Sequence, residues 1–110
     1  MSNKETLGEF EQVVLLGILR LGQNAYGMTV RREIQCRAGR DASIGAVYTT
    51  LARLEKKGFV ESFDGEPTPE RGNRPKRFFR VTATGHTALK GSLAALSRMA
   101  KGMRVAWGKI

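Results

Sequence analysis

The segment Ser43–Lys57 constrains the fold of this chain more than any other. Its apolar residues are spaced 3, 4 and 3 positions apart, which places them on one face of a helix: Ile44, Val47, Leu51 and Leu54. Ser43 is a suitable N-cap, and Gly58 stands where a helix commonly ends. The opposite face is small, polar and basic, with Gly45, Ala46, Thr49, Arg53, Lys56 and Lys57, flanked by Tyr48 and Thr50. The pattern predicts a helix that buries one ridge and exposes a polar face.

Two helices are expected before this one. The first runs from about Gly8 to Leu21, and the second from Tyr26 or Gly27 to just before Gly39. The first helix is apolar around most of its circumference, so it must be covered on two sides. The core of a 110-residue chain covers one side. We therefore expect a partner subunit on the other side, contacting Phe10 and Val14.

A hairpin is predicted after the third helix. Phe59–Phe63 and Lys76–Val81 have the alternation of strands. The stretch Asp64–Pro75 between them is dense in Gly, Pro and Asn, and so is predicted to be turn and loop. Such a connection is longer than most hairpin loops, which suggests that it has a use.

The last predicted helix begins at Thr82 or Thr84 and continues to about Val105. Leucine, alanine and methionine recur in it at spacings of 4, 3, 4 and 3, a short heptad seam: Leu89, Leu93, Leu96, Ala100 and Met103. We expect this helix to pair with its copy in a second chain. The residues assigned to dimerisation are Phe10, Val14, Leu89, Leu93, Leu96 and Met103. The chain is then divided into a domain at 1–82, which contains the first three helices and the hairpin, and a dimerisation helix at 83–110.

Three helices followed by a two-stranded hairpin is the order of a winged helix-turn-helix, a mainly α fold with a small β-hairpin (α+β class). A helix about 10–12 Å wide fits the DNA major groove, which is about 12 Å wide. Small residues at its leading end permit close approach, and Arg53 can bond a guanine edge. The expected reading residues are Ser43, Gly45, Ala46, Tyr48, Thr49, Thr50 and Arg53.

The distribution of charge also favours a polyanionic partner. The net charge is +9, and residues 71–110 hold ten Lys/Arg and no acidic residue, whereas residues 1–70 hold all ten acids. A basic hairpin loop can follow the DNA backbone or enter the minor groove, where it supplies affinity more than specificity. The residues assigned to the wing and backbone contacts are Tyr26, Arg71, Asn73, Arg74, Lys76 and Arg77.

Other classes of function are disfavoured. His86 is the only histidine, no Ser-His-Asp set or phosphate-binding glycine loop is present, and we expect no enzyme activity, metal or cofactor. With no targeting pattern and no membrane-spanning stretch, we expect a cytoplasmic protein that does not enter membranes. The single cysteine, Cys36, excludes an intramolecular disulfide; it is either an ordinary helix residue or a redox-sensing thiol.

The chain resembles the PadR-like transcriptional regulators over about Leu7 to Leu96. The resemblance is carried by Ala25-Tyr26-Gly27, by the segment Ser43–Val60 with its Gly-Ala-Val-Tyr motif, by the Pro-Glu-Arg-Gly wing within Glu66–Arg77, and by Thr82-Ala83-Thr84-Gly85. It implies a homodimeric winged-helix protein, commonly a repressor. Members of the family often respond to small aromatic compounds. A single helix after the wing is similar to the short subgroup of the family. Any effector would then bind at the dimer interface, where Trp107 is either a packing residue or an aromatic surface for a flat ligand.

Two alternatives stay open at this point. A non-specific architectural or RNA-binding protein would also explain the basic C-terminal region, but it does not require a small polar face on the third helix. A protein-interaction adaptor would use the winged helix as a scaffold only. Sequence-independent binding would favour the former, and failure to bind duplex at low salt the latter.

Overall fold

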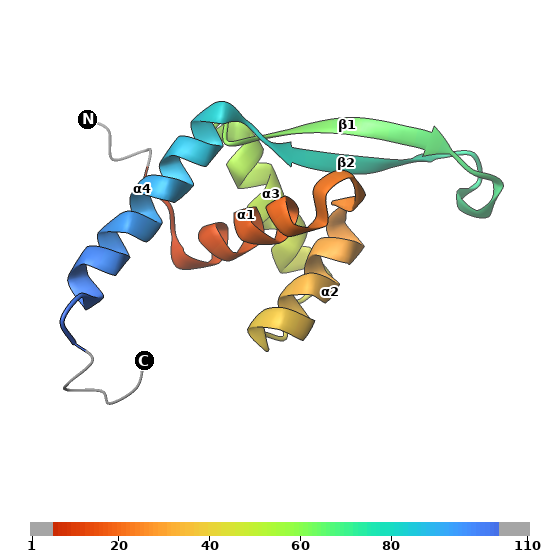
Figure 1. Ribbon diagram of the computed structural model, residues 1–110. Coiled ribbons are helices and arrows are strands. Elements are labelled where there is room, and N and C mark those ends of the chain that lie inside the picture. Colours follow the sequence, from red (N-terminus) through yellow and green to blue (C-terminus); the bar gives the residue numbers. More distant parts are fainter. Residues whose placement is uncertain (1–5, 104–110) are drawn as a thin grey trace.

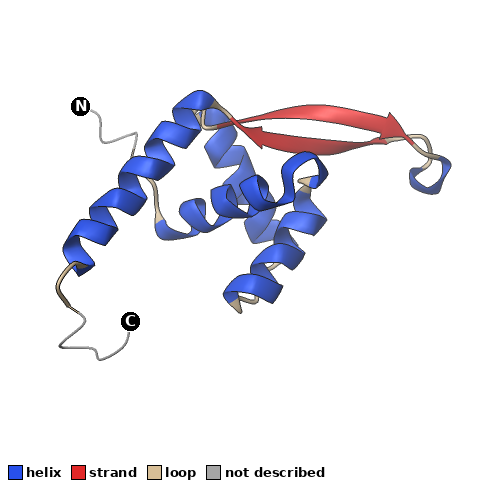
Figure 2. Cartoon of the chain, viewed as in Figure 1, coloured by secondary structure: helices blue, strands red, loops and turns tan. Residues whose placement is uncertain are grey.

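The computed structural model describes residues 6–103, and its helices and hairpin follow the predicted order (Figures 1 and 2). The elements are α1 (Glu9–Leu21), α2 (Gly27–Ala38), α3 (Ile44–Lys56), β1 (Val60–Pro67), β2 (Pro75–Val81) and α4 (Ala83–Ala100), with short 3-10 turns η2 (Gly22–Asn24) and η3 (Pro69–Arg71). The predicted α+β fold class is thereby confirmed. None of the helices in the described part is long and apolar enough to span a membrane.

Local signals account for the helix ends. The Ser43 hydroxyl accepts a hydrogen bond from the backbone N–H of Ala46 at 3.0 Å and so caps α3. The Thr82 hydroxyl does the same for the N–H of Gly85 at the start of α4, also at 3.0 Å. Gly39 ends α2 in the left-handed region, with φ of 64°, where a side chain would be strained.

One core lies between α1, α2, α3 and the root of the hairpin, the end at which Val60 pairs with Val81. The four predicted ridge residues of α3 differ in burial: Val47, Leu51 and Leu54 are fully buried, whereas Ile44 at the first turn is half-buried. The remaining core residues are Leu7, Val14, Leu15, Ile18, Ala25, Val30, Ile34, Phe59, Val60, Phe79 and Leu89. Because the apolar side of α3 is buried in this core, its polar side faces solvent.

The hairpin is longer than the sequence predicts, and this corrects the assignment of Asp64–Pro75 as turn and loop. β1 continues to Pro67 and β2 begins at Pro75, so the connection is short and contains the η3 turn. Phe63 pairs with Phe78 and Asp64 with Arg77 across the strands. These cross-strand partners extend the pairing through a stretch whose composition favours turns.

α4 leaves the body of the molecule after its first two turns (Figure 1). Gly85 and Leu89 are buried, whereas Leu93, Leu96 and Met99 are 38%, 59% and 79% exposed. The helix ends at Ala100, ahead of the positive φ of Gly102. The predicted end near Val105 lies outside the described residues, as does Trp107.

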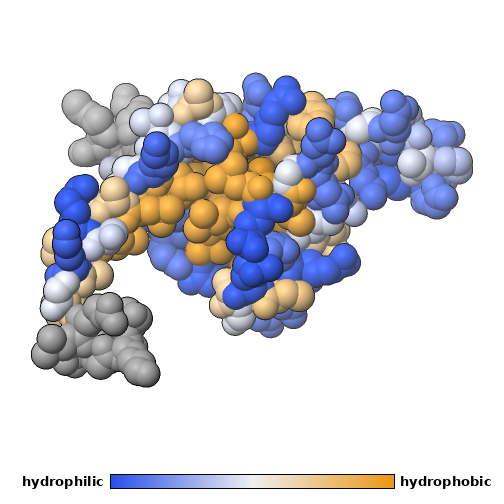
Figure 3. Space-filling model, viewed as in Figure 1, coloured by the Kyte–Doolittle hydropathy of each residue, from blue (hydrophilic) through white to orange (hydrophobic). Residues whose placement is uncertain are grey.

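Two of the residues assigned to dimerisation need correction. Val14 and Leu89 are buried within their own chain, at 0% and 3% exposure, so neither is free to contact a partner. Phe10 is half-buried under the Arg40 guanidinium, and Met103 is half-buried in the turn after α4. Leu93 and Leu96 remain on the surface, where apolar side chains gather over α1 and the adjoining part of α4 (Figure 3).

Candidate nucleic-acid interface

The outward face of α3 has the character that the sequence predicts. Gly45, Ala46, Thr49 and Arg53 are exposed, while the ridge behind them is buried. At Gly45 a Cβ would have only the Ser43 hydroxyl as a close neighbour, at 3.9 Å. The leading end of α3 is therefore narrow, and a nucleic acid can approach the helix backbone closely.

Three of the predicted reading residues, Ser43, Tyr48 and Thr50, contact other parts of the protein. Thr50 is 5% exposed and lies on the core side of α3, so its assignment to the reading face is wrong. The cause is the helical period, which turns Thr50 toward the same side as Val47 and Leu51. The Ser43 hydroxyl is occupied as the helix cap. Tyr48 is 47% exposed, and its ring lies against the start of α2, where a Cβ on Gly27 would overlap its Cζ atom.

The turn between α2 and α3 is fixed by Arg31. Its Nε donates to the carbonyl oxygen of Ala42 at 2.8 Å, and its Nη2 lies 4.0 Å from the Asp41 carboxylate. An arginine on α2 thus bonds the backbone just before the cap of α3. This contact ties the turn of the helix-turn-helix to α2.

The wing presents most of its basic side chains to solvent. Arg71, Asn73, Arg74 and Arg77 are exposed, as expected, and Lys76 is half-buried. The loop is held by its own side chains, because Arg71 Nε donates to the Arg74 carbonyl at 3.4 Å and Arg74 Nε to that of Arg71 at 3.1 Å. The loop projects beyond the helical body (Figure 1).

Tyr26 joins the wing to the start of α2. It forms an antiparallel bridge with Phe78, and the Phe79 N–H donates to the Ala25 carbonyl at 2.9 Å. Lys76 Nζ lies 4.4 Å from the centre of the Tyr26 ring and 3.3 Å from its hydroxyl. The structure therefore brings together Tyr26 and Lys76, two residues that the sequence assigned to the same set of wing and DNA-backbone contacts.

Comparison with known proteins decides the family. The model of the family described as "Transcriptional regulator PadR-like family" matches residues 15–91. The chain belongs to this family. Its members are DNA-binding transcriptional regulators and not enzymes, which confirms those two predictions.

Solved structures agree with this assignment of fold. A PadR-like transcriptional regulator from Bacillus cereus has a TM-score of 0.73 at 15% identity, covering 92% of this chain and 93% of that one. A PadR family transcription regulator from Clostridium difficile gives 0.70 at 18% identity, with 90% and 99% covered. A transcriptional regulator from Clostridium thermocellum gives 0.70 at 22% identity, with 86% and 88% covered. No curated protein matches the chain.

The ion pairs of this PadR-like regulator leave its interface cations free. Glu61 holds Arg80 at 2.7 Å, and Glu33 accepts from both Arg20 and Arg37 at 3.2 and 2.9 Å. Among residues 6–103, in contrast, Arg53, Arg74 and Arg77 form no ion pair. Unpaired cations on α3 and on the wing are available for an external anion.

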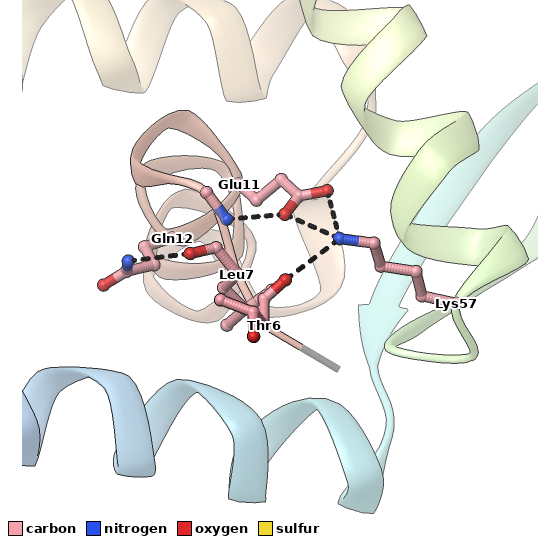
Figure 4. A network of polar contacts seen from close by, with 6 residues as sticks. Thr6, Leu7, Glu11, Gln12 and Lys57 are labelled. Carbon is pink, nitrogen blue, oxygen red and sulfur yellow. Dashed lines mark hydrogen bonds and ion pairs between the residues drawn. The ribbon is translucent and has the colours of Figure 1, made fainter. Parts of the chain in front are cut away.

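Two contacts at this interface were not predicted. Lys57, which the sequence placed on the outward face of the predicted helix Ser43–Lys57, instead caps the end of α3 and donates to both carboxylate oxygens of Glu11 at 2.9 Å (Figure 4). The other is the seat of the Tyr48 ring on Gly27. Both join residues from different helices, so no local pattern could reveal them; the glycine at the start of α2 was the only available signal.

Proposed function

We propose that this PadR-like regulator is a homodimeric repressor that recognises a near-palindromic DNA site. The observation that carries the proposal is the exposed face of α3, where small residues precede Thr49 and Arg53, an arginine with no ion pair among residues 6–103. Such a face can enter the major groove, and an arginine at its edge can bond guanine O6 and N7. Bound over a promoter, the protein would exclude other proteins from that DNA.

The wing is proposed to hold the DNA backbone. Arg71, Arg74 and Arg77 are exposed cations on a hairpin that projects from the body, and phosphates are their natural partners. Each phosphate neutralised should lower log affinity by about 0.9 per unit of log salt. Affinity would then come mainly from the wing, and base preference from α3.

A second copy is proposed to cover the exposed apolar surface of α1 and α4. Leu16 and Leu19 of α1 are 38% and 39% exposed, and Leu93, Leu96 and Met99 continue this surface on α4. Such a surface favours a partner, and two copies would place their α3 helices about 34 Å apart, one turn of DNA. Leu96→Glu should yield monomers in sedimentation, whereas Ala94→Glu, on the far side of α4, should leave the dimer intact.

We place the protein in the cytoplasm and its effector site between the two subunits. A regulator of this kind works in the cytoplasm, where promoters are reached directly. A small aromatic effector would bind between the two subunits, since the described chain has one helix after the wing and no separate ligand domain. Binding of such a compound should change the affinity for DNA and leave the isolated monomeric Leu96→Glu variant unaffected.

Selection of bound duplexes from a random pool tests the central claim. The wild type should enrich one motif with two half-sites, and Arg53→Ala should alter the enriched bases. Arg74→Ala is the matched control, because it should weaken binding to all sequences equally and leave the motif unchanged. Equal binding of all duplexes, or preference for RNA, would replace the proposal with an architectural or RNA-binding role; no binding to either would favour the adaptor.

A further inference from the structure

The hairpin carries a row of stacked side chains on one face. Lys76, Phe78 and Arg80 alternate along β2 and therefore point to the same side. The Phe78 ring stacks on Phe63, its cross-strand partner, with ring centres 5.8 Å apart, and meets Tyr26 edge-on at 5.4 Å. Lys76 covers the Tyr26 ring at one end, and Arg80 covers Phe63 at the other, 4.7 Å from its centre.

An irregularity in the pairing lies beside this row. Asp64 pairs with Arg77 and Pro67 with Pro75, so two residues of β1, Gly65 and Glu66, lie opposite the single residue Lys76. An extra residue of this kind bends the strand and increases its twist. The bend is located between the root of the wing and its basic loop, and it therefore determines where the loop points.

Gly65 is the point where the row and the bend meet. A Cβ at this position would overlap Cε1 of Phe78 and lie 3.0 Å from Cδ1. The Phe78 ring cannot move aside freely, because Tyr26 and Phe63 hold it on two sides. The absence of a side chain at Gly65 is therefore what allows the ring to cover the bend.

We propose that Gly65 and Phe78 are positioning residues that fix the direction of the wing relative to α3. Phe78 locks the hairpin to Tyr26 at the start of α2, and Gly65 provides the space that the lock requires. The basic loop is thereby held at the angle at which its cations reach the DNA phosphate backbone while α3 lies in the major groove. This inference rests on the proposed function, because the consequence of a displaced wing is measured on DNA.

Gly65→Ala is the test variant, and Gly91→Ala is its matched control, because a Cβ at Gly91 would have no neighbour within 4 Å. Gly65→Ala should weaken binding to all duplexes together, with the enriched motif unchanged. The slope of log affinity against log salt is negative, and its magnitude should decrease by about 0.9 for each phosphate that the displaced wing no longer neutralises. A loss of folding alone would lower the melting temperature and the fraction of active protein without changing this slope.

A second variant separates the lock from any general effect of the substitution. Phe78→Leu should fold, lower the salt slope by itself, and make Gly65→Ala almost without further effect, because the ring that the new Cβ displaces is gone. The proposal would be overturned if Gly65→Ala bound DNA with the affinity and salt slope of the wild type. It would also be overturned if Gly65→Ala lowered the affinity as much in the Phe78→Leu background as it does in the wild type.

A measurement without DNA keeps this inference distinct from the proposed function. Nuclear Overhauser effects between the Tyr26 and Phe78 rings should be present in the free wild type and in Gly91→Ala, and absent in Gly65→Ala. If the wild type binds no duplex, the proposed function fails while these ring-to-ring signals still decide the lock. If the signals survive in Gly65→Ala, the lock is refuted whatever the DNA measurements give.

Discussion

Lys57 Nζ lies 2.9 Å from each carboxylate oxygen of Glu11, joining the residue that caps the C-terminus of α3 to the first turn of α1 (Figure 4). The carboxylate is almost completely buried and also accepts the Gly8 N–H at 2.7 Å, while the ammonium donates to the Thr6 carbonyl at 3.2 Å. A charged group so enclosed depends on its partner. The pair therefore fixes the end of the reading helix to the body of the domain.

Removal of this pair should destabilise the fold. Lys57→Met keeps the apolar stem but leaves the Glu11 carboxylate buried without its cation, at a cost of about 2–3 kcal/mol in the free energy of unfolding. Lys56→Met removes an equal charge from an exposed neighbour and should change stability by less than about 0.5 kcal/mol. Urea unfolding of both variants provides the comparison, and equal stability of the two would contradict the assigned role.

Two glycines of α4 should respond oppositely to alanine. A Cβ on Gly85 would overlap the Phe59 carbonyl oxygen and lie 2.9 Å from Val81 Cγ1. Because the obstacle is backbone, Gly85→Ala should cost about 3 kcal/mol through displacement of the helix from the wing root. Gly91→Ala has open space and should stabilise the helix by up to about 1 kcal/mol. Thermal unfolding measures both changes, and a neutral Gly85→Ala would mean that α4 packs less closely than described.

Glu33 should give stability a dependence on acid. Hydrogen bonding from Arg37, helped by Arg20 and opposed by some desolvation, lowers the pKa of this carboxyl below its usual value. The folded chain thus binds this proton less readily than the unfolded chain. The contribution is complete above the usual carboxyl pKa and is lost as the pH falls through the lowered value.

The comparison is between the wild type and Glu33→Gln. Their difference in unfolding free energy should be present at neutral pH and narrow as the solution is acidified. High salt at neutral pH should reduce it as well, since the pairs are exposed to solvent. A difference that stays constant across the acid range would show that the glutamine acts through something other than the charge.

The sequence predicted the helices well, because their signals are local. The 3-4-3 spacing from Ile44 to Leu54 and the Ser43 cap placed α3 correctly. The hairpin was predicted too short, because Asp64–Pro67 has the composition of a turn and extends as a strand only through its partners on β2. The family resemblance was correct and is confirmed by the match over residues 15–91.

Burial was predicted less well than secondary structure. Leu89 belongs to a heptad-like series, yet it packs into its own core because the first turns of α4 lie against the wing root. Lys57 looked like a surface cation, and its partner Glu11 stands far away in sequence. A wheel drawn for one helix contains no information about what the neighbouring helix offers, so such contacts require the tertiary structure.

Thr49 and Thr50 provide the sharpest test of the reading face, since they are adjacent and chemically identical. Thr49 is exposed on α3, whereas Thr50 is 5% exposed on the core side. Thr49→Val removes a hydroxyl that can bond a base edge, and should change preference at its base position by about 1–3 kcal/mol, which is roughly 5- to 150-fold in relative affinity. Thr50→Val keeps the shape of a buried side chain and should leave the selected motif unchanged, even if stability shifts. Competition binding with single-base variants of the selected site measures both, and a new preference in Thr50→Val with none in Thr49→Val would mean that α3 meets DNA through another face.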